Sequence, residues 1–313
     1  MERRDFLKAG VVALTVPFVD RASAALSPGN SLIQDPYPRI GLSTTAFRAR
    51  FPATRNRNGG PITTPELTML TAPKLIIDEV GLKNVEIWEA QWEEKSDAYA
   101  TRIRTSTTAA GGRIIDIQVD TADFNISDPD AARRAQAITA QKTWIDRAVV
   151  VGSPRVRLNT GLPAGQPHRE LAHTIDSYRQ LAEYAESKGI TVLIENHLGT
   201  TATDVAAIVG AVNHPRLRSL IDWGNTGGGT AEQMIADLAP TFPTLGLISA
   251  KAQEFDENYN HKNWDIGALV RATEDAGFRG IYSIELWETR NPPPDPVRAA
   301  KAVRDIIAAN LRS

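Results

Sequence analysis

The sequence contains no cysteine and carries almost no excess charge of either sign. The lack of thiols excludes disulfide bonds, thiolate metal ligands and cysteine nucleophiles. Because 35 Lys and Arg stand against 37 Asp and Glu, the formal net charge is −2. No global field therefore draws the chain to nucleic acid or to an anionic membrane. The apolar run near its start, residues 9–19, is too short to cross a bilayer of about 30 Å, so we expect no membrane span.

That apolar run belongs to a pattern typical of an export signal. Arg3 and Arg4 precede it, and the small residues Ala22-Ser23-Ala24 follow it. A basic start, a short apolar run and an A-x-A end predict a cleavable signal, and the paired arginines favour the twin-arginine route. An ordinary N-terminal helix is the alternative. We therefore expect an exported or periplasmic protein with three segments: a signal peptide at 1–25, a lead-in at 26–36 and a folded domain at 37–313.

Short apolar runs alternate with longer stretches of helical periodicity along the rest of the chain. This alternation predicts a parallel sheet with crossover helices, and eight strands are the number that closes a (β/α)8 barrel. The fold class expected is therefore α/β, a single-domain TIM barrel. The expected strands are 40–43, 85–88, 114–118, 156–159, 191–195, 217–222, 245–249 and 281–285. The expected helices are 65–80, opened by Thr64-Pro65, and 93–110, 130–150, 168–188, 202–213, 231–239, 265–276 and 296–311.

An open, doubly wound sheet is the alternative fold for the same pattern. Its best marker is a glycine-rich phosphate turn after the first strand, and this sequence has none there. The run Gly227–Gly229 lacks the strand-turn-helix context of such a turn. The barrel is therefore the favoured reading.

Four polar residues stand at the ends of the last four expected strands: Glu195, Asp222, Ser249 and Glu285. Strand ends of a barrel point into one shared mouth, so we expect these side chains to meet there. Three carboxylates in one dry site repel each other unless a cation or a proton is present. Hard oxygen ligands favour Mn²⁺ or Mg²⁺, with Zn²⁺ or Co²⁺ possible. The alternative for each acid alone is a helix cap or a surface group.

These strand ends carry a family resemblance. The segments Ile194–His197, Ile221–Asn225, Ser249–Ala252 and Ser283–Glu285 resemble motifs of the xylose-isomerase-like TIM-barrel family of sugar (phosphate) isomerases and epimerases. The resemblance extends over about residues 37 to 310. It implies a divalent ion held by Glu195, Asp222 and Glu285. The family's third ligand is a histidine, and Ser249 stands in that position. His197 is two residues beyond Glu195 and is the candidate for a replacement ligand, while Lys251 is the candidate for a replacement cation.

The resemblance also implies a chemistry. Members of the family move a proton next to a carbonyl through a metal-stabilised enediolate, with two glutamates as base and acid. By position, Glu195 and Glu285 take the catalytic roles. The residues expected to bind or orient a sugar-like substrate are Trp88, Arg157, Asn159, Asn225, Ser249 and Lys251.

Other functions remain open at this stage. The chain could be a catalytically degenerate sugar-binding barrel, because Ser249 departs from the family pattern. It could also be a lyase that cleaves a keto-glycoside by β-elimination, since an exported protein meets free sugars and glycosides more readily than sugar phosphates. A nuclease of the same fold is disfavoured. Such enzymes use several histidines, but only His197 is near the predicted mouth, and the expected negative charge of the mature chain does not suit DNA, which favours a basic face. The expected partner is a small sugar-like molecule and not nucleic acid, and the oligomeric state stays open.

Overall fold

The computed structural model describes residues 35–55, 66–120, 125–162, 170–287 and 295–312. The predicted signal peptide and all but the last two residues of the predicted lead-in lie outside these residues. Residues 32–313 form one compact unit.

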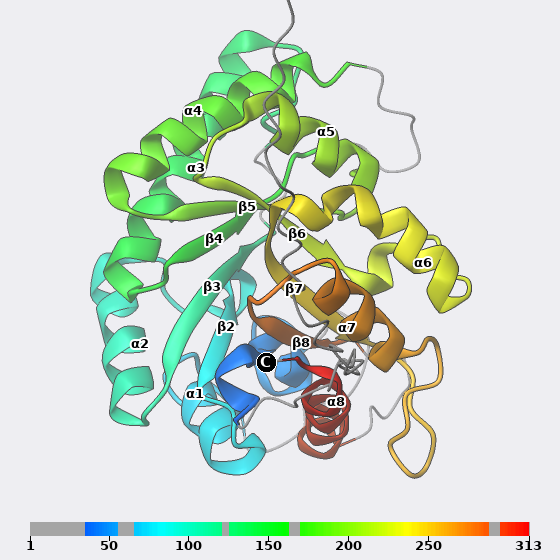
Figure 1. Ribbon diagram of the computed structural model, residues 1–313. Coiled ribbons are helices and arrows are strands. Elements are labelled where there is room, and N and C mark those ends of the chain that lie inside the picture. The colour runs from blue at the N-terminus through cyan, green and yellow to red at the C-terminus, as the bar shows by residue number, and fades with distance from the viewer. Residues whose placement is uncertain (1–34, 56–65, 121–124, 163–169, 288–294, 313) are drawn as a thin grey trace, which may run out of the picture. The chain divides into compact units, whose positions relative to one another are not determined.

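Eight parallel strands close into a barrel in simple chain order (Figure 1). Each strand pairs with the next, and β8 pairs with β1 through Ile40 opposite Tyr282. This closure confirms the predicted TIM barrel and rules out the open sheet. The strands are β1 Ile40–Ser43, β2 Asn84–Trp88, β3 Arg113–Val119, β4 Arg155–Leu158, β5 Thr191–Glu195, β6 Leu217–Asp222, β7 Leu245–Ala252 and β8 Tyr282–Leu286.

The helices surround the strands, and most of them begin at a residue that caps them. Asp130 accepts a hydrogen bond from the backbone of Arg133, and Thr201 forms a capping box with Asp204. The helices are α1 Ala72–Leu75, α2 Asp97–Ala109, α3 Ala131–Val151, α4 Ala172–Lys188, α5 Ala202–Val212, α6 Ala231–Leu238, α7 Ile266–Asp275 and α8 Pro296–Asn310.

The first predicted helix differs from the observed one. Residues 66–71 are not helical, and α1 begins only at Ala72, after which the chain continues as a π-helix over Ile76–Val80. Pro73 is the reason, because proline is well tolerated at the start of a helix and poorly in its interior. Thr64 and Pro65, the predicted start, lie outside the described residues.

The interior of the barrel is packed in layers beneath its carboxyl end. Leu193, Leu220 and Leu247, each two residues before a predicted site residue, are fully or almost fully buried and form an apolar plug with Ile115. Alternate residues of a strand share a face, so the residues that follow this plug point into the mouth. The plug thus forms part of the floor of the mouth.

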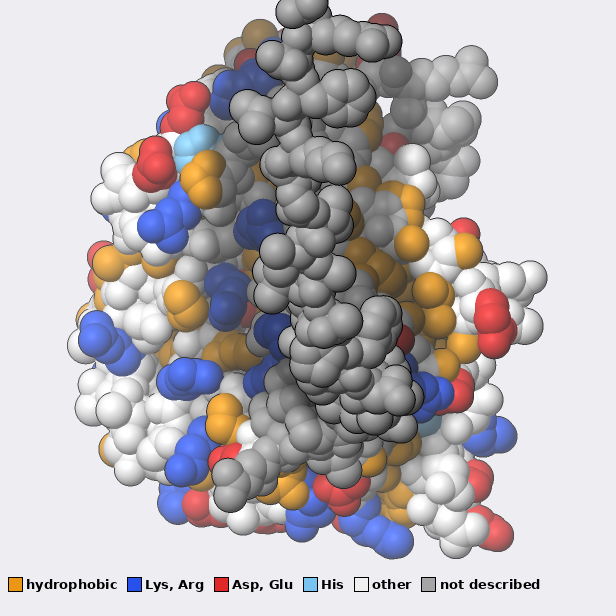
Figure 2. All heavy atoms as spheres, in the orientation of Figure 1, with side chains coloured by type: hydrophobic (Ala, Val, Ile, Leu, Met, Phe, Trp, Pro, Cys, Tyr) orange, Lys and Arg blue, Asp and Glu red, His pale blue; other side chains and the backbone are white. Residues whose placement is uncertain are grey.

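The described surface carries charges of both signs. On the face shown in Figure 2, acidic and basic side chains both occur around the rim of the described part. Among the described helices, none is long and apolar enough to cross a membrane.

Candidate active site

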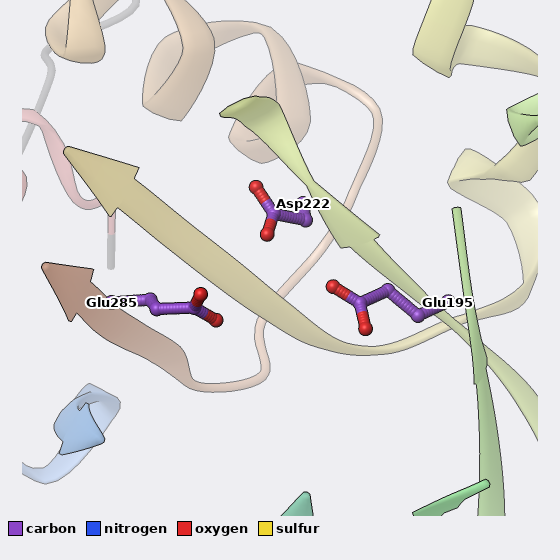
Figure 3. A group of neighbouring side chains, drawn as sticks. All are labelled: Glu195, Asp222 and Glu285. Atoms are coloured by element: carbon purple, nitrogen blue, oxygen red, sulfur yellow. The ribbon is translucent and has the colours of Figure 1, made fainter. Parts of the chain in front are cut away.

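Glu195, Asp222 and Glu285 lie at the carboxyl ends of β5, β6 and β8. Their side chains point toward one another across the barrel mouth (Figure 3). One carboxylate oxygen of each lies within 4.8 Å of those of the other two, and all three residues are buried. The convergence that the strand ends predicted is therefore present.

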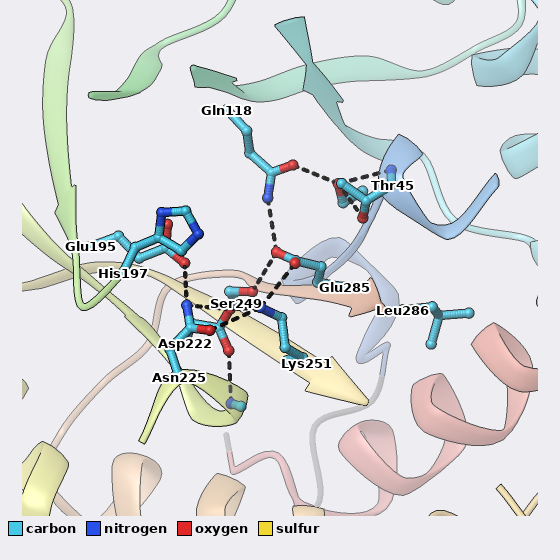
Figure 4. Close-up of polar contacts among 12 residues, drawn as sticks. Thr45, Gln118, Glu195, His197, Asp222, Asn225, Ser249, Lys251, Glu285 and Leu286 are labelled. Carbon is cyan, nitrogen blue, oxygen red and sulfur yellow. Dashed lines mark hydrogen bonds and ion pairs between the residues drawn. The ribbon is translucent and has the colours of Figure 1, made fainter. Parts of the chain in front are cut away.

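A lysine provides positive charge within this group. The Lys251 ammonium lies 2.6 Å from Asp222 Oδ2 and 3.1 Å from Glu285 Oε1, and it donates a hydrogen bond of 3.2 Å to Asn225 Oδ1 (Figure 4). The Asn225 amide in turn donates to Glu195 Oε1 at 3.2 Å and to Asp222 Oδ2 at 3.1 Å. Lys251 and Asn225 thus join the three carboxylates into one network.

Two neutral side chains complete the surroundings of Glu285. Its Oε2 accepts hydrogen bonds from Gln118 Nε2 at 3.0 Å and from Ser249 Oγ at 3.1 Å (Figure 4). Gln118 is held from behind by Ser43, whose hydroxyl donates to its side-chain oxygen at 2.9 Å. Ser249 therefore serves as a hydrogen-bond donor to the Glu285 carboxylate.

The other side of the mouth is organised by Arg157 at the end of β4. Its guanidinium forms ion pairs with Asp120 and, through Nε, with Glu195 Oε2 at 3.1 Å. Asp120 also accepts hydrogen bonds of 2.8 Å from Asn159 Nδ2 and from Trp88 Nε1. Arg157 consequently connects a structural carboxylate to a candidate catalytic one.

His197 lies on this same side. Its Nδ1 is 3.2 Å from Asn159 Nδ2 and 3.9 Å from Asp120 Oδ1. Burial and the nearby Arg157 charge lower the pKa of His197, so the imidazole is neutral at neutral pH. Its place as a metal ligand stays a prediction, since its Nδ1 lies against Asn159 and Asp120.

The environment drives the pKa values of the two candidate catalytic glutamates apart. Burial raises the pKa of Glu195 to about 7, although Arg157 acts in the opposite direction. Burial alone would also raise the pKa of Glu285, but Lys251 and Arg157 outweigh it and leave that pKa below its ordinary value. Such a separation is typical of acid and base pairs in enzymes.

The remaining charges follow from the same contacts. Burial raises the pKa of Asp222 to about 7, although Lys251 opposes this. Burial lowers the pKa of Lys251, but Asp222 and Glu285 outweigh that effect and keep the ammonium charged. Burial also works against ionised Asp120, but Arg157 outweighs it and leaves the pKa of Asp120 far below the usual range.

A cavity of about 220 Å³ opens above these groups. Trp287 forms one wall, with the Arg48 guanidinium 4.6 Å from its ring centroid and the Trp88 ring in edge contact at 5.9 Å. An aromatic wall facing polar groups is suited to a molecule with one apolar face and several hydroxyls. The lining residues are Thr45, Gln118, Asp120, Arg157, Glu195, His197, Asn225, Lys251, Gln253, Glu285 and Trp287.

The predicted site residues occupy two positions relative to this cavity. Six of the ten line it: Arg157, Glu195, His197, Asn225, Lys251 and Glu285. Asp222 and Ser249 are fully buried behind Lys251 and Glu285, while Trp88 and Asn159 support Asp120.

Sequence reasoning missed Asp120 and Gln118. Gln118 lies near the end of β3, and Asp120 follows that strand directly. The strand-end rule was applied only to the last four strands. Its extension to the third strand would have found both residues.

A family model describes the same fold that the structure shows, a TIM barrel. The model for the xylose isomerase-like TIM barrel matches residues 76–306. The chain belongs to this family. No curated protein sequence is significantly similar to it.

Several solved structures share the fold of this xylose isomerase-like barrel. An L-ribulose 3-epimerase is similar with a TM-score of 0.67 and 18% identity over 87% of this chain and 94% of that one. A D-psicose 3-epimerase from Clostridium cellulolyticum H10, solved with D-tagatose, gives 0.64 and 16% over 88% and 100%. A xylose isomerase-like barrel protein from Mycobacterium smegmatis, solved with magnesium, gives 0.60 and 17% over 87% and 97%.

The charges at the mouth of this xylose isomerase-like barrel fit a divalent ion. Four carboxylates, when ionised, face the two fixed cations Arg157 and Lys251, which leaves an excess of two negative charges. The oxygen donors of Glu195, Asp222 and Glu285 suit a hard cation. Ser249 contributes a hydroxyl where the family resemblance implies an imidazole.

Proposed function

We propose that the protein is an exported sugar isomerase or epimerase that moves a proton next to the carbonyl of a sugar or keto-glycoside. The observation that carries the proposal is the placement of Glu195 and Glu285 on opposite sides of one cavity, with pKa values shifted in opposite directions. The similarity to ketose 3-epimerases supports it at the level of the fold.

The two glutamates have complementary protonation states. In the site without an ion, Glu285 is ionised near neutral pH, whereas Glu195 is close to half-protonated because its pKa is about 7. Glu285 accepts the proton from the carbon beside the carbonyl, and the electron pair of the broken C–H bond moves into an enediolate. Glu195 delivers a proton from the other side. Delivery to the same carbon inverts it. Delivery to the former carbonyl carbon, with a proton passing from the neighbouring hydroxyl to the former carbonyl oxygen, interconverts ketose and aldose.

The other residues hold substrate and charge. Glu195, Asp222 and Glu285 would hold a divalent ion, Mn²⁺ or Mg²⁺ by preference, which when bound stabilises negative charge on the substrate oxygens. Asn225 lines the cavity and orients Glu195 and Asp222, to which its amide donates. Trp287 packs against the apolar face of the sugar ring.

Export bears on the class of substrate. We retain the twin-arginine signal as part of the proposal, and an exported enzyme meets free sugars and oxidised glycosides. A 3-keto-glycoside has an acidic proton beside its carbonyl, which the same two glutamates could remove. If the bond to a leaving group lies next to the resulting carbanion, β-elimination follows, and the lyase function is then the outcome.

The test is proton exchange in D₂O. Mature protein supplied with Mn²⁺ is incubated with ketohexoses and with a 3-keto-glycoside, and NMR follows deuterium entering the carbon next to the carbonyl. We expect exchange with the wild type and a loss of about 10²–10⁴-fold in Glu285→Gln, the usual contribution of a general base. Glu183→Gln, an exposed position on α4, is the control and should exchange normally.

The contrary outcomes are distinct. Binding of a sugar without exchange by the wild type would support the degenerate sugar-binding barrel. Release of the aglycone without an epimer would support the lyase. Exchange that is equal in the wild type and Glu285→Gln would refute the assignment of the base.

A further inference from the structure

The Lys251 ammonium has a complete set of partners inside the site. It carries three N–H groups, and three acceptors surround it: Asp222 Oδ2 at 2.6 Å, Glu285 Oε1 at 3.1 Å and Asn225 Oδ1 at 3.2 Å. Its side chain is only 7% exposed. A buried ammonium with all donors satisfied is a fixed part of the site.

The backbone beside Lys251 is shaped to admit its stem. Gly224 lies in the 3₁₀ turn Trp223–Asn225, which directly follows β6. A Cβ on Gly224 would lie 2.8 Å from Lys251 Cγ and closer still to its Cδ. Real Cβ atoms do not approach other carbons this closely, so any larger residue at position 224 would push the lysine away.

Lys251 contacts two of the three carboxylates that could hold a metal ion, Asp222 and Glu285. Asp222 Oδ1 accepts the backbone N–H of Gly224 at 2.7 Å, and Oδ2 is taken by Lys251 and Asn225. Glu285 Oε2 accepts from two neutral donors, and Oε1 is taken by Lys251. Each oxygen of Asp222 and Glu285 thus already has a partner.

We propose that Lys251 is a resident cation that competes with a divalent ion for Asp222 and Glu285. The inference rests on the proposed metal site. Entry of the ion displaces the ammonium, because two cations on the same oxygens repel strongly in a dry site. Lys251 already lines the cavity, so the displaced ammonium is directed toward the substrate oxygens. Occupation by a metal would thereby convert this lysine from a partner of carboxylates into a ligand of the substrate.

The test measures binding of Mn²⁺ alone, without substrate or turnover. Titrations followed by electron paramagnetic resonance give the Kd of wild type and of two variants. Lys251→Met removes the competing charge. Gly224→Ala keeps the charge, but its added methyl group occupies the space of the Lys251 side chain. We expect both to bind Mn²⁺ at least about tenfold more tightly than the wild type. Lys188→Met, which removes a lysine paired with Asp146 on the surface, is the control and should leave the Kd unchanged.

Each other outcome overturns the inference. Tighter binding in Lys251→Met with no change in Gly224→Ala would mean that the charge acts at a distance and does not occupy the place of the metal. Unchanged or weaker binding in both variants would mean that Lys251 does not compete. If the wild type binds Mn²⁺ in that case, the proposed metal site stands without the competition. If no form binds Mn²⁺, the metal part of the proposed function fails as well, and the exchange assay without added metal then decides whether the proton transfer survives.

Discussion

Ser249 shows how one residue can alter a site while the fold stays the same. It stands opposite Asp222 in the pairing of β6 with β7, in the position where the family resemblance implies a histidine ligand. Its hydroxyl donates to Glu285 Oε2 at 3.1 Å, so the residue supports a carboxylate. A neutral hydroxyl binds a divalent ion less strongly than an imidazole does, because imidazole is the better donor for transition metals.

Restoring the histidine should strengthen the metal site. We expect Ser249→His to bind Mn²⁺ about tenfold more tightly than the wild type, because a nitrogen donor replaces a hydroxyl next to Asp222 and Glu285. Isothermal titration calorimetry gives the Kd. Ser249→Ala is the matched control, since it removes the hydroxyl without adding a ligand, and it should not tighten binding. Equal Kd values for the histidine and alanine variants would argue that the position does not face the ion.

At the scale of elements, a buried ion pair holds the two ends of the barrel together. Arg39 precedes β1, and Glu274 lies on α7. Two guanidinium nitrogens of Arg39 donate to the two oxygens of Glu274 at 2.6 and 3.1 Å. Tyr282 of β8 donates to the same carboxylate at 2.8 Å, and so does the backbone of Arg312 at 3.1 Å. The first strand is thus joined to the last helices where the barrel closes.

Breaking this pair should destabilise the whole barrel. Glu274→Gln leaves the Arg39 guanidinium without its counter-charge, and we expect a loss of about 3 kcal/mol in the free energy of unfolding. Urea unfolding followed by circular dichroism measures it. Asp176→Asn, which breaks the exposed Arg179–Asp176 pair on α4, should cost less than about 1 kcal/mol. Similar losses in the two variants would show that the buried pair contributes no more to the free energy of unfolding than the exposed pair does.

At the scale of the whole molecule, the barrel interior holds a pair of acids below the active site. Glu86 and Asp116 are both fully buried and lie opposite each other in the pairing of β2 with β3. Ser283 donates a hydrogen bond to Glu86, while the other oxygen of Glu86 and both oxygens of Asp116 have no donor. Two carboxyl groups in such a place share a proton, because two buried charges would repel each other.

This pair should make stability depend on pH. Burial raises the pKa of Asp116 to about 7, although Arg157 opposes the shift, whereas an unfolded chain has an aspartate pKa near 3.9. The native state therefore retains a proton that the unfolded state releases. The stability tied to this proton is fully present below about pH 4 and is lost as the pH rises through about 7.

Asp116→Asn cannot ionise and should escape that loss. We expect its free energy of unfolding, relative to the wild type, to rise between pH 5 and pH 8 by at least about 1.4 kcal/mol, the equivalent of one pKa unit. Urea unfolding at both pH values measures the difference, in which the titrating groups that do not contact this acid pair cancel. Asp237→Asn, at an exposed position on α6, is the control and should show no such trend. A difference that does not vary with pH would contradict the shared proton.

Sequence patterns alone predicted the barrel and the three converging carboxylates. Strand and helix periodicity is local, and parallel strands must direct their carboxyl ends to one face, so Glu195, Asp222 and Glu285 could be located by counting along strands. The same rule, extended to the third strand, predicts that Asp120 also lies at the barrel mouth.

Only the tertiary structure determined the partners of these groups. The contact of Lys251 with Gly224, the bridge from Arg157 to Asp120 and Glu195, and the acid pair in the barrel interior depend on which side chains meet after the barrel closes. Periodicity along the chain does not predict these side-chain contacts. The residues lie on strands that are brought together by pairing and packing around the whole barrel, not by their spacing in the sequence.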